Sequence, residues 1–558
     1  MRRIGSSLEY KMNVRLQNKG AWKLVSFILL GIFLICIASF VLQSDFYLQN
    51  EPQDCTALER EPEIYPDYRD IVAPNNIAPL NFDINESDVE KALTVVKVEK
   101  FDPKGEKANL RDAGERGEKV ASFTGTKIRF SKKKWKKILS EHGGDTLVFS
   151  IYVKRDGSWE KFDDWTISIS NDKIDSWVSY RKIAPGYEYF SDLALWNRNV
   201  ETFEERPFFR ARLYRERTCV NCHSYQNYRT DAFFFHQRFS GAGTVFGING
   251  KVLKRDLNAD GLQGGCAYPS WRPNSLHVAF ASCSTFQTFH TSSPDRIDVL
   301  DGFSDLYLYD VVNNSLSPIV SNGDDTLDTY PSWSPDGSTL YYCSAKNPGF
   351  KTTRESTQEE NNVATIDRKS ETLQIRENLK YDIKKISFDE ATGEFGASEI
   401  VFSASSQGKS ALFPRISPDG KSMLFTLTRY GCFPIWYRDA DIWLMDLTTG
   451  QSRPIEEINS PSESDSYHSW NSTGRWIVFS SRRDDGTYTR LYFSHLEDSG
   501  RFSKPFMLPQ EDPRQNLDNM RSYNVPEFTI EPVKISERRI LEVDKKSTPE
   551  KAVLKRGK

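Results

Sequence analysis

A unit that repeats four times in the second half of the chain constrains the fold most. Each copy reads as a short strand, a tight polar turn and an apolar strand, and the copies begin at Tyr268, Tyr330, Phe413 and Tyr467. A second strand pair follows each copy, at 306–309, 381–388, 442–445 and 491–493. Four strands per unit, recurring at irregular intervals, predict the blades of a β-propeller with insertions.

The turns of two units make this prediction more specific. Ser-Pro-Asp-Gly occurs at 334–337 and 417–420, where proline sets the turn, aspartate supports it and glycine takes the positive φ. With the segment 441–450, Asp-Ile-Trp-Leu-Met-Asp-Leu-Thr-Thr-Gly, these turns resemble the repeat of TolB-type (PD40) β-propellers over roughly residues 240–510. The resemblance implies six blades, and strands near 244–254 and 523–535 are candidates to complete the ring.

A second motif is Cys219-Val-Asn-Cys222-His223, which has the C-x-x-C-H spacing of c-type haem attachment. Its two thiols can add to the vinyl groups of a porphyrin, and its imidazole can ligate the iron. A structural zinc site would need a further Cys or His cluster, and a thioredoxin-like dithiol would need a strand-to-helix turn, and the sequence predicts neither. We therefore predict one haem c, bound through Cys219 and Cys222 with His223 as the proximal iron ligand.

The other axial ligand and the contacts to the haem propionates are less defined. His236 is the first candidate for the distal ligand because it lies close in sequence among phenylalanines, although a packed or surface histidine is an equal reading. Weaker candidates for the distal ligand are His290, His468 and Met520. Three arginines either pair with the haem propionates or only face solvent: Arg215, Arg217 and Arg229.

The segment from Leu24 to Leu42 carries no charge and is just long enough to span a bilayer as a helix. Basic residues precede it and acidic residues follow it, which orients the N-terminus toward the cytoplasm. A cleaved signal peptide is the alternative, but no clear small-x-small site follows. Resemblance to cytochromes c implies attachment outside the cytoplasm. We therefore expect a single-pass protein of a bacterial inner membrane whose bulk is periplasmic.

These features divide the chain into an all-β protein behind a membrane helix. The predicted parts are a cytoplasmic tail (1–23), the anchor (24–42), a linker (43–90), a small β-sandwich-like, immunoglobulin-like domain (91–200), a haem-attachment segment (201–236), the propeller (237–535) and a charged tail (536–558). Within the small domain, Ser131 is expected to cap a short helix over 132–139. The net charge of −3 gives no indication of nucleic-acid binding.

Two further patterns have structural and functional readings. Cys266 and Cys283 stand symmetrically about a hairpin turn and form a disulfide if the strands pair without a bulge. The segment 256–261, Asp-Leu-Asn-Ala-Asp-Gly, matches the first half of a calcium loop, but its twelfth position is Ala267 and a plain turn is favoured.

Three functions remain open from the sequence. The first is electron transfer or redox sensing by a haem protein whose propeller docks a protein partner. The second is an interaction scaffold in which the haem is minor or absent. The third is a haem or propeller enzyme, but the chain has none of the Gly-x-Ser-x-Gly, His-Glu-x-x-His or phosphate-binding glycine motifs, so a non-enzymatic role is favoured.

Overall fold

The computed structural model describes residues 48–100, 117–184, 192–214, 218–290, 293–295, 297–320, 325–349, 352–353, 365–366, 375–546 and 548–555. The predicted cytoplasmic tail (1–23) and membrane anchor (24–42) lie outside the described residues, as do Arg215 and Arg217. Within these ranges, no helix is both long enough and apolar enough to cross a bilayer.

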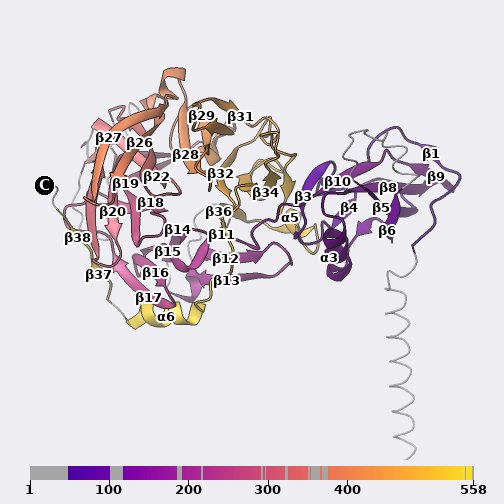
Figure 1. Ribbon diagram of the computed structural model, residues 1–558, viewed down its shortest axis with the longest axis horizontal. Helices are drawn as coiled ribbons and strands as arrows, with labels where there is room; N and C mark the ends of the chain where they lie inside the picture. Colours follow the sequence, from indigo (N-terminus) through magenta and orange to yellow (C-terminus); the bar gives the residue numbers. More distant parts are fainter. Residues whose placement is uncertain are drawn as a thin grey trace, which may run out of the picture.

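The described chain forms two bodies, a small N-terminal domain and a larger ring of β-sheets (Figure 1). The small domain has a seven-stranded sheet centred on β8 (Thr146–Arg155). This strand pairs with β5 (Lys91–Glu99) along one edge and with β9 (Ser158–Lys161) and β10 (Trp165–Ser170) along the other. The remaining strands of this sheet are β1 (Thr56–Ala57), β3 (Ile71–Pro74) and β6 (Glu118–Thr124). A three-stranded sheet contains β2 (Ile64–Tyr65), β4 (Phe82–Ile84) and β7 (Lys127–Ile128).

The two sheets of the small domain share one apolar core. Phe149 stacks on Trp165 with 4.1 Å between the ring centroids, and Phe82 of the smaller sheet meets Trp165 edge-on at 5.5 Å. The domain is therefore sandwich-like. Parallel pairing of β1 with β9 and of β3 with β10 departs from the antiparallel immunoglobulin plan. The segment 43–90 was predicted to be a linker, which is wrong for its described part, because β1 to β4 lie there and contribute to this core.

The predicted helix of the small domain is present as α3 (Lys132–Glu141). The hydroxyl of Ser131 accepts a hydrogen bond from the backbone N–H of Lys134 at 3.3 Å, which is the capping role expected of serine. The apolar face of α3 buries Trp135, Ile138 and Leu139. The lysines of this segment are thus the solvent-facing side of an amphipathic helix.

The ring is a β-propeller with six blades in the described residues. From the innermost strand outward, blade 1 contains β36 (Ser522–Thr529), β11 (Trp177–Ile183), β12 (Ala194–Asn199) and β13 (Glu205–Arg210), and blade 2 contains β14 (Thr218–Gln226), β15 (Arg229–Phe239), β16 (Gly243–Ile248) and β17 (Lys251–Asp256). Blade 3 contains β18 (Gly265–Trp271), β19 (His277–Phe289), β20 (Ile297–Asp310) and β21 (Ser315–Val320), and blade 4 contains β22 (Thr326–Trp333), β23 (Thr339–Lys346), β26 (Tyr381–Asp389) and β27 (Glu394–Phe402). Blade 5 contains β28 (Ser410–Ile416), β29 (Ser422–Thr428), β30 (Asp441–Asp446) and β31 (Ser452–Pro454), and blade 6 contains β32 (Asp465–Trp470), β33 (Trp476–Ser481), β34 (Arg490–His495) and β35 (Phe506–Met507).

Blade 1 closes the ring because its strands come from distant parts of the chain. β36 pairs antiparallel with β11, so a C-terminal strand completes a sheet that begins near residue 177. The innermost strand β36 lies between those of blades 6 and 2. The predicted boundaries are therefore wrong in two places. The strands β11 to β13, whose residues were assigned to the small domain and the haem segment, belong to blade 1, and β14 and β15 are the two inner strands of blade 2.

The C-terminal segment runs along the outside of the ring. Helix α6 (Glu537–Lys546) packs against β13 and β17, and Ile540 and Val533 enter the core between blades 1 and 2. The short strands β37 (Glu550–Lys551) and β38 (Val553–Leu554) then pair with the outer edges of blades 2 and 3. The prediction of a charged tail over 536–558 is thus wrong for its described part, because its apolar positions are used in packing.

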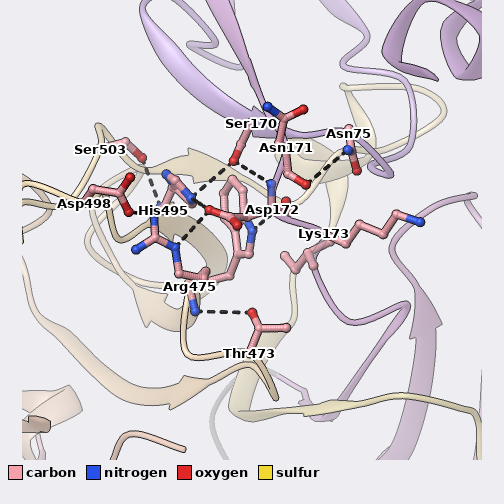
Figure 2. Close-up of polar contacts among 12 residues, drawn as sticks. Asn75, Ser170, Asn171, Asp172, Lys173, Thr473, Arg475, His495, Asp498 and Ser503 are labelled. Atoms are coloured by element: carbon pink, nitrogen blue, oxygen red, sulfur yellow. Dashed lines mark hydrogen bonds and ion pairs between the residues drawn. The ribbon is translucent and has the colours of Figure 1, made fainter. Parts of the chain in front are cut away.

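The small domain packs against blade 6. One apolar cluster contains residues of both bodies, including Phe149 and Trp476. Figure 2 shows the polar part of this contact, in which Asp172 accepts from His495 Nε2 at 2.7 Å and from Arg475 Nε at 2.9 Å. Trp476 also donates its indole N–H to the backbone carbonyl of Asp172. The two bodies thus share a continuous interface of apolar and charged groups.

Candidate functional site: the central cavity

A cavity of about 700 Å³ lies along the axis of the propeller. Residues from the innermost strands of all six blades line it, and these strands share one irregularity. A β-bulge with a positive φ recurs at the same position of each strand, and the six residues at this position are Cys222, Tyr268, Tyr330, Phe413, Tyr467 and Val525. The repeat found in the sequence is therefore the wall of this cavity.

The C-x-x-C-H motif forms part of the innermost strand of blade 2 rather than a separate segment. Cys219 lies opposite Arg238 in the neighbouring strand β15, and the pairing register shifts between Asn221 and Ser224. Because of this bulge, Cys222 has a φ of 53°, which is unusual for a residue with a side chain. A regular strand would direct residues three apart to opposite faces, whereas here Cys219, Cys222 and His223 all line the cavity.

Both motif cysteines are free thiols, and Cys219 is the more buried of the two. Burial raises the pKa of the Cys219 thiol, against the opposing effect of the positive charges of Arg181 and Arg238. Arg181 also donates to the backbone carbonyl of Val220 at 3.2 Å, which fixes one side of the motif strand. The Cys219 thiol is therefore under the influence of two positive charges that line the same cavity.

The imidazole of His223 is buried, with 4% of the residue exposed. Burial lowers its pKa to about 3, helped by the charge of Arg181 and opposed by a hydrogen bond with the backbone of Ser179. Its Nε2 atom has no hydrogen-bond partner among the described residues. A neutral imidazole with an unused buried nitrogen has the chemistry of a metal ligand.

Aromatic rings fill much of the cavity wall at the bulge position. The ring centroids of Tyr268 and Tyr330 are 4.4 Å apart, those of Tyr330 and Phe413 are 4.0 Å apart, and those of Phe413 and Tyr467 are 4.8 Å apart. Blades 2 and 1 have the smaller Cys222 and Val525 at the same position. Large aromatic side chains thus line the cavity at blades 3 to 6, and smaller side chains line it at blades 1 and 2.

The charged groups of the cavity wall are mainly positive. Arg181, Arg238 and Arg415 line it, whereas Glu527 is the one carboxylate among its described lining residues. Burial raises the pKa of Glu527 to about 7, so this group is only partly charged near neutral pH. The wall therefore favours a ligand that carries negative charge.

The structure does not bring the predicted distal ligand His236 into the cavity. Its ring packs near Phe234 and Phe280, and its Nδ1 lies 2.7 Å from the hydroxyl of Thr244. The weaker candidates also lie elsewhere. His290 contacts Asp298, His468 is buried against the backbone of Phe413, and Met520 is 62% exposed. Arg229 pairs with Asp231 at the surface.

The two other sequence patterns are structural. Trp271 pairs with Val278 as expected, but a bulge sets Cys266 opposite Ser282 instead of Cys283, and both thiols are free. In the calcium-like segment, Asp256 caps a turn by accepting from the N–H of Asn258. In the part of the chain that the structure describes, no three His, Cys, Asp or Glu side chains gather as a metal site.

The cavity residues missed by sequence reasoning share a detectable signal. Ser224, Ser270, Ser332 and Ser469 stand two positions after the bulge in four blades, and Arg415 and Glu527 take this position in the other two. An aromatic residue or isoleucine follows in every blade. Alignment of Cys222-His-Ser-Tyr225 with Tyr268-Pro-Ser-Trp271 would have placed the motif in a blade, and Arg415 and Glu527 as exceptions to its repeat.

One prediction follows for His468, which occupies in blade 6 the place of His223 in blade 2. Burial lowers its pKa to about 3, so below about pH 6.5 the unfolded chain binds a proton that the folded chain excludes. Each unit by which the pH falls in this range is therefore expected to lower the free energy of unfolding of the wild type by about 1.4 kcal/mol through this site. In His468→Gln this loss is expected to be absent. Urea unfolding of both proteins between about pH 6 and pH 4 measures this difference. The prediction is wrong if the free energies of unfolding of the two proteins change in parallel with pH.

No family model matches the chain, and no curated protein matches it. Solved structures to which it is similar include an oligogalacturonate lyase in complex with manganese, with 13% identity, a TM-score of 0.26 and coverage of 63% of this chain and 86% of the other. A putative 6-phosphogluconolactonase from Bacteroides fragilis has 11% identity, a TM-score of 0.29 and coverage of 64% and 97%. A DUF4784 family protein from Bacteroides caccae has 7% identity, a TM-score of 0.27 and coverage of 70% and 95%. None of these similarities bears on function.

Proposed function

We propose that the protein binds one haem c in the central cavity of its propeller and acts in electron transfer or redox-linked protein interaction. One observation carries the proposal. Cys219, Cys222 and His223 line the same cavity, and the buried Nε2 of His223 has no partner in the described chain. The strand bulge at Cys222 is what brings the three side chains to one wall.

Each motif residue has a defined part in this proposal. Cys219 and Cys222 would hold the porphyrin through thioether bonds, and His223 would offer a neutral imidazole that burial keeps unprotonated. The aromatic wall from Tyr268 to Tyr467 would exclude water from the group. Bound haem supplies one-electron chemistry, with a potential that its ligands and surroundings set.

The proposal is consistent with the membrane anchor expected near the N-terminus. Covalent haem attachment outside the cytoplasm agrees with an anchor at 24–42, a periplasmic body and a TolB-like propeller that docks a protein partner. A propeller presents its blade loops as a broad surface around the mouth of its cavity. The redox partner would bind over this surface.

A covalent haem assay tests the proposal. The full chain, produced with the cytochrome c attachment machinery, is expected to retain haem stain and a c-type spectrum after denaturing electrophoresis. Cys219→Ala together with Cys222→Ala is expected to remove the stain completely. The matched control is Cys266→Ala, which alters a half-buried thiol in the next blade.

His223→Ala and His468→Ala form a second matched pair, because the two histidines occupy equivalent strand positions. His223→Ala is expected to change the spectrum or prevent haem retention, and His468→Ala is expected to leave the spectrum as in the wild type. An unstained wild-type chain, or equal effects of the two histidine variants, would rule out the proposal.

An interaction scaffold is the second candidate, and the repeat itself favours it. His468 shows that a histidine fits this strand position through packing and a hydrogen bond to the Phe413 carbonyl at 2.9 Å. The motif could therefore be one more variant of the blade strand. A partner retained equally by the wild type and by the double cysteine variant would support this role.

A further inference from the structure

Arg415 breaks the repeat at a position that faces the central cavity. Two residues after the bulge, four blades have serine, whereas blade 5 has Arg415 and blade 1 has Glu527. A serine is small and neutral, so it leaves space in the cavity, and a guanidinium there brings a fixed positive charge and a fork of donors. The fold does not require an arginine at this position, because the neighbouring blades 4 and 6 have serine there.

Arg415 has no ion-pair partner among the described residues. Its side chain is half-buried in the cavity wall. Burial lowers the pKa of Arg415, and the charge of Glu527 opposes this effect without forming an ion pair with it. An arginine held in this way is a binding group for a carboxylate, for which bidentate pairing is the preferred geometry.

The position of blade 5 relative to the motif adds the second argument. In a ring of six blades, blade 5 stands opposite blade 2, which contributes Cys219 and Cys222. The vinyl and propionate groups of a haem lie on opposite edges of the porphyrin. A haem attached through its vinyl edge at blade 2 would extend its propionate edge toward blade 5.

We propose that Arg415 is the carboxylate-binding residue of the central cavity and that, in the haem-loaded protein, its carboxylate is a haem propionate. The identity of this ligand rests on the proposed function, whereas the carboxylate site itself would also accept a free carboxylate. This assignment replaces Arg229, which the sequence suggested and which pairs with Asp231 instead.

The test uses the full chain produced without the haem-attachment machinery. Haemin, its dimethyl ester and benzoate are titrated separately, and tryptophan fluorescence reports binding because Trp271, Trp333 and Trp470 line the cavity. Haemin is expected to bind at least tenfold more tightly than the ester. Arg415→Gln is expected to abolish this preference, and the control Arg229→Gln is expected to retain it.

The outcomes separate the two proposals. If neither porphyrin binds but benzoate binds and loses at least tenfold affinity in Arg415→Gln, the carboxylate site stands and its source is a free acid, while the haem proposal fails. If haemin and its ester bind equally and benzoate binding does not depend on Arg415, the carboxylate site is overturned even when the haem stain is positive. Failure of all three probes to bind also overturns it.

Discussion

Asp544→Ala is expected to lower the free energy of unfolding by about 3–5 kcal/mol, the range for removing one member of a buried ion pair. Asp544 on α6 pairs with Lys254 Nζ on β17, and their side chains are 1% and 3% exposed. Lys254 also donates to the Tyr214 hydroxyl at 3.1 Å and to the Gly241 carbonyl at 2.9 Å. These neutral groups would remain, but the ammonium would lose its carboxylate partner.

Urea unfolding measures this effect, and two variants control it. Lys254→Met with Asp544→Leu removes both charges and is expected to recover most of the lost stability, because no unpaired charge stays buried. Lys551→Ala removes the lysine of an exposed pair with Asp260 in the same C-terminal segment and is expected to cost less than about 1 kcal/mol. A loss below about 1 kcal/mol for Asp544→Ala would show that the buried pair with Lys254 does not stabilise the protein.

Trp476→Ala is expected to cost about 3–5 kcal/mol, the range for a large buried aromatic side chain. Trp476 is fully buried in the cluster that the small domain shares with blade 6, and it meets the His495 ring at 4.6 Å between centroids. Its loss also removes the indole hydrogen bond to the Asp172 carbonyl, at the contact drawn in Figure 2.

Because this core is continuous, the small domain and the propeller are expected to unfold together in one transition. Calorimetry measures this in the wild type, in Trp476→Ala and in the control Trp159→Ala, which alters a half-buried tryptophan at the far edge of the small domain. We expect Trp476→Ala to lower the single transition temperature more than Trp159→Ala. Two separate wild-type transitions would contradict the shared core.

Local sequence signals predicted most of the propeller. Ser-Pro-Asp-Gly turns act as expected, since Asp336 accepts from the Ser338 N–H at 3.0 Å and Gly337 has a φ of 70°. These signals identified blades 3 to 6. For blade 1, the candidate strand within 523–535 is confirmed as β36. Its outer strands β11 to β13 were assigned elsewhere, because they lie far from β36 in the sequence and that pairing has no local signature.

The innermost strand of blade 2 was not predicted, for a different reason. Its innermost strand has Cys222 and His223 where most other blades have an aromatic residue and proline, so the chemical motif concealed the structural repeat. Proximity in sequence also misled the choice of His236. It lies on the adjacent strand β15, where its side chain enters the core near Phe280 and not the cavity. Arg415 stands in the repeat where Tyr268-Pro-Ser-Trp271 has serine, but that this position faces the cavity is seen only in the structure.

We propose above that the motif of blade 2 holds haem inside the propeller. Crystals of the full chain matured with haem, measured on both sides of the iron absorption edge, test it most directly. We predict one anomalous peak in the central cavity, bonded to Nε2 of His223, with continuous density to Cys219 and Cys222. Crystals without iron, or with iron bound outside this cavity, would show that the motif does not hold haem there.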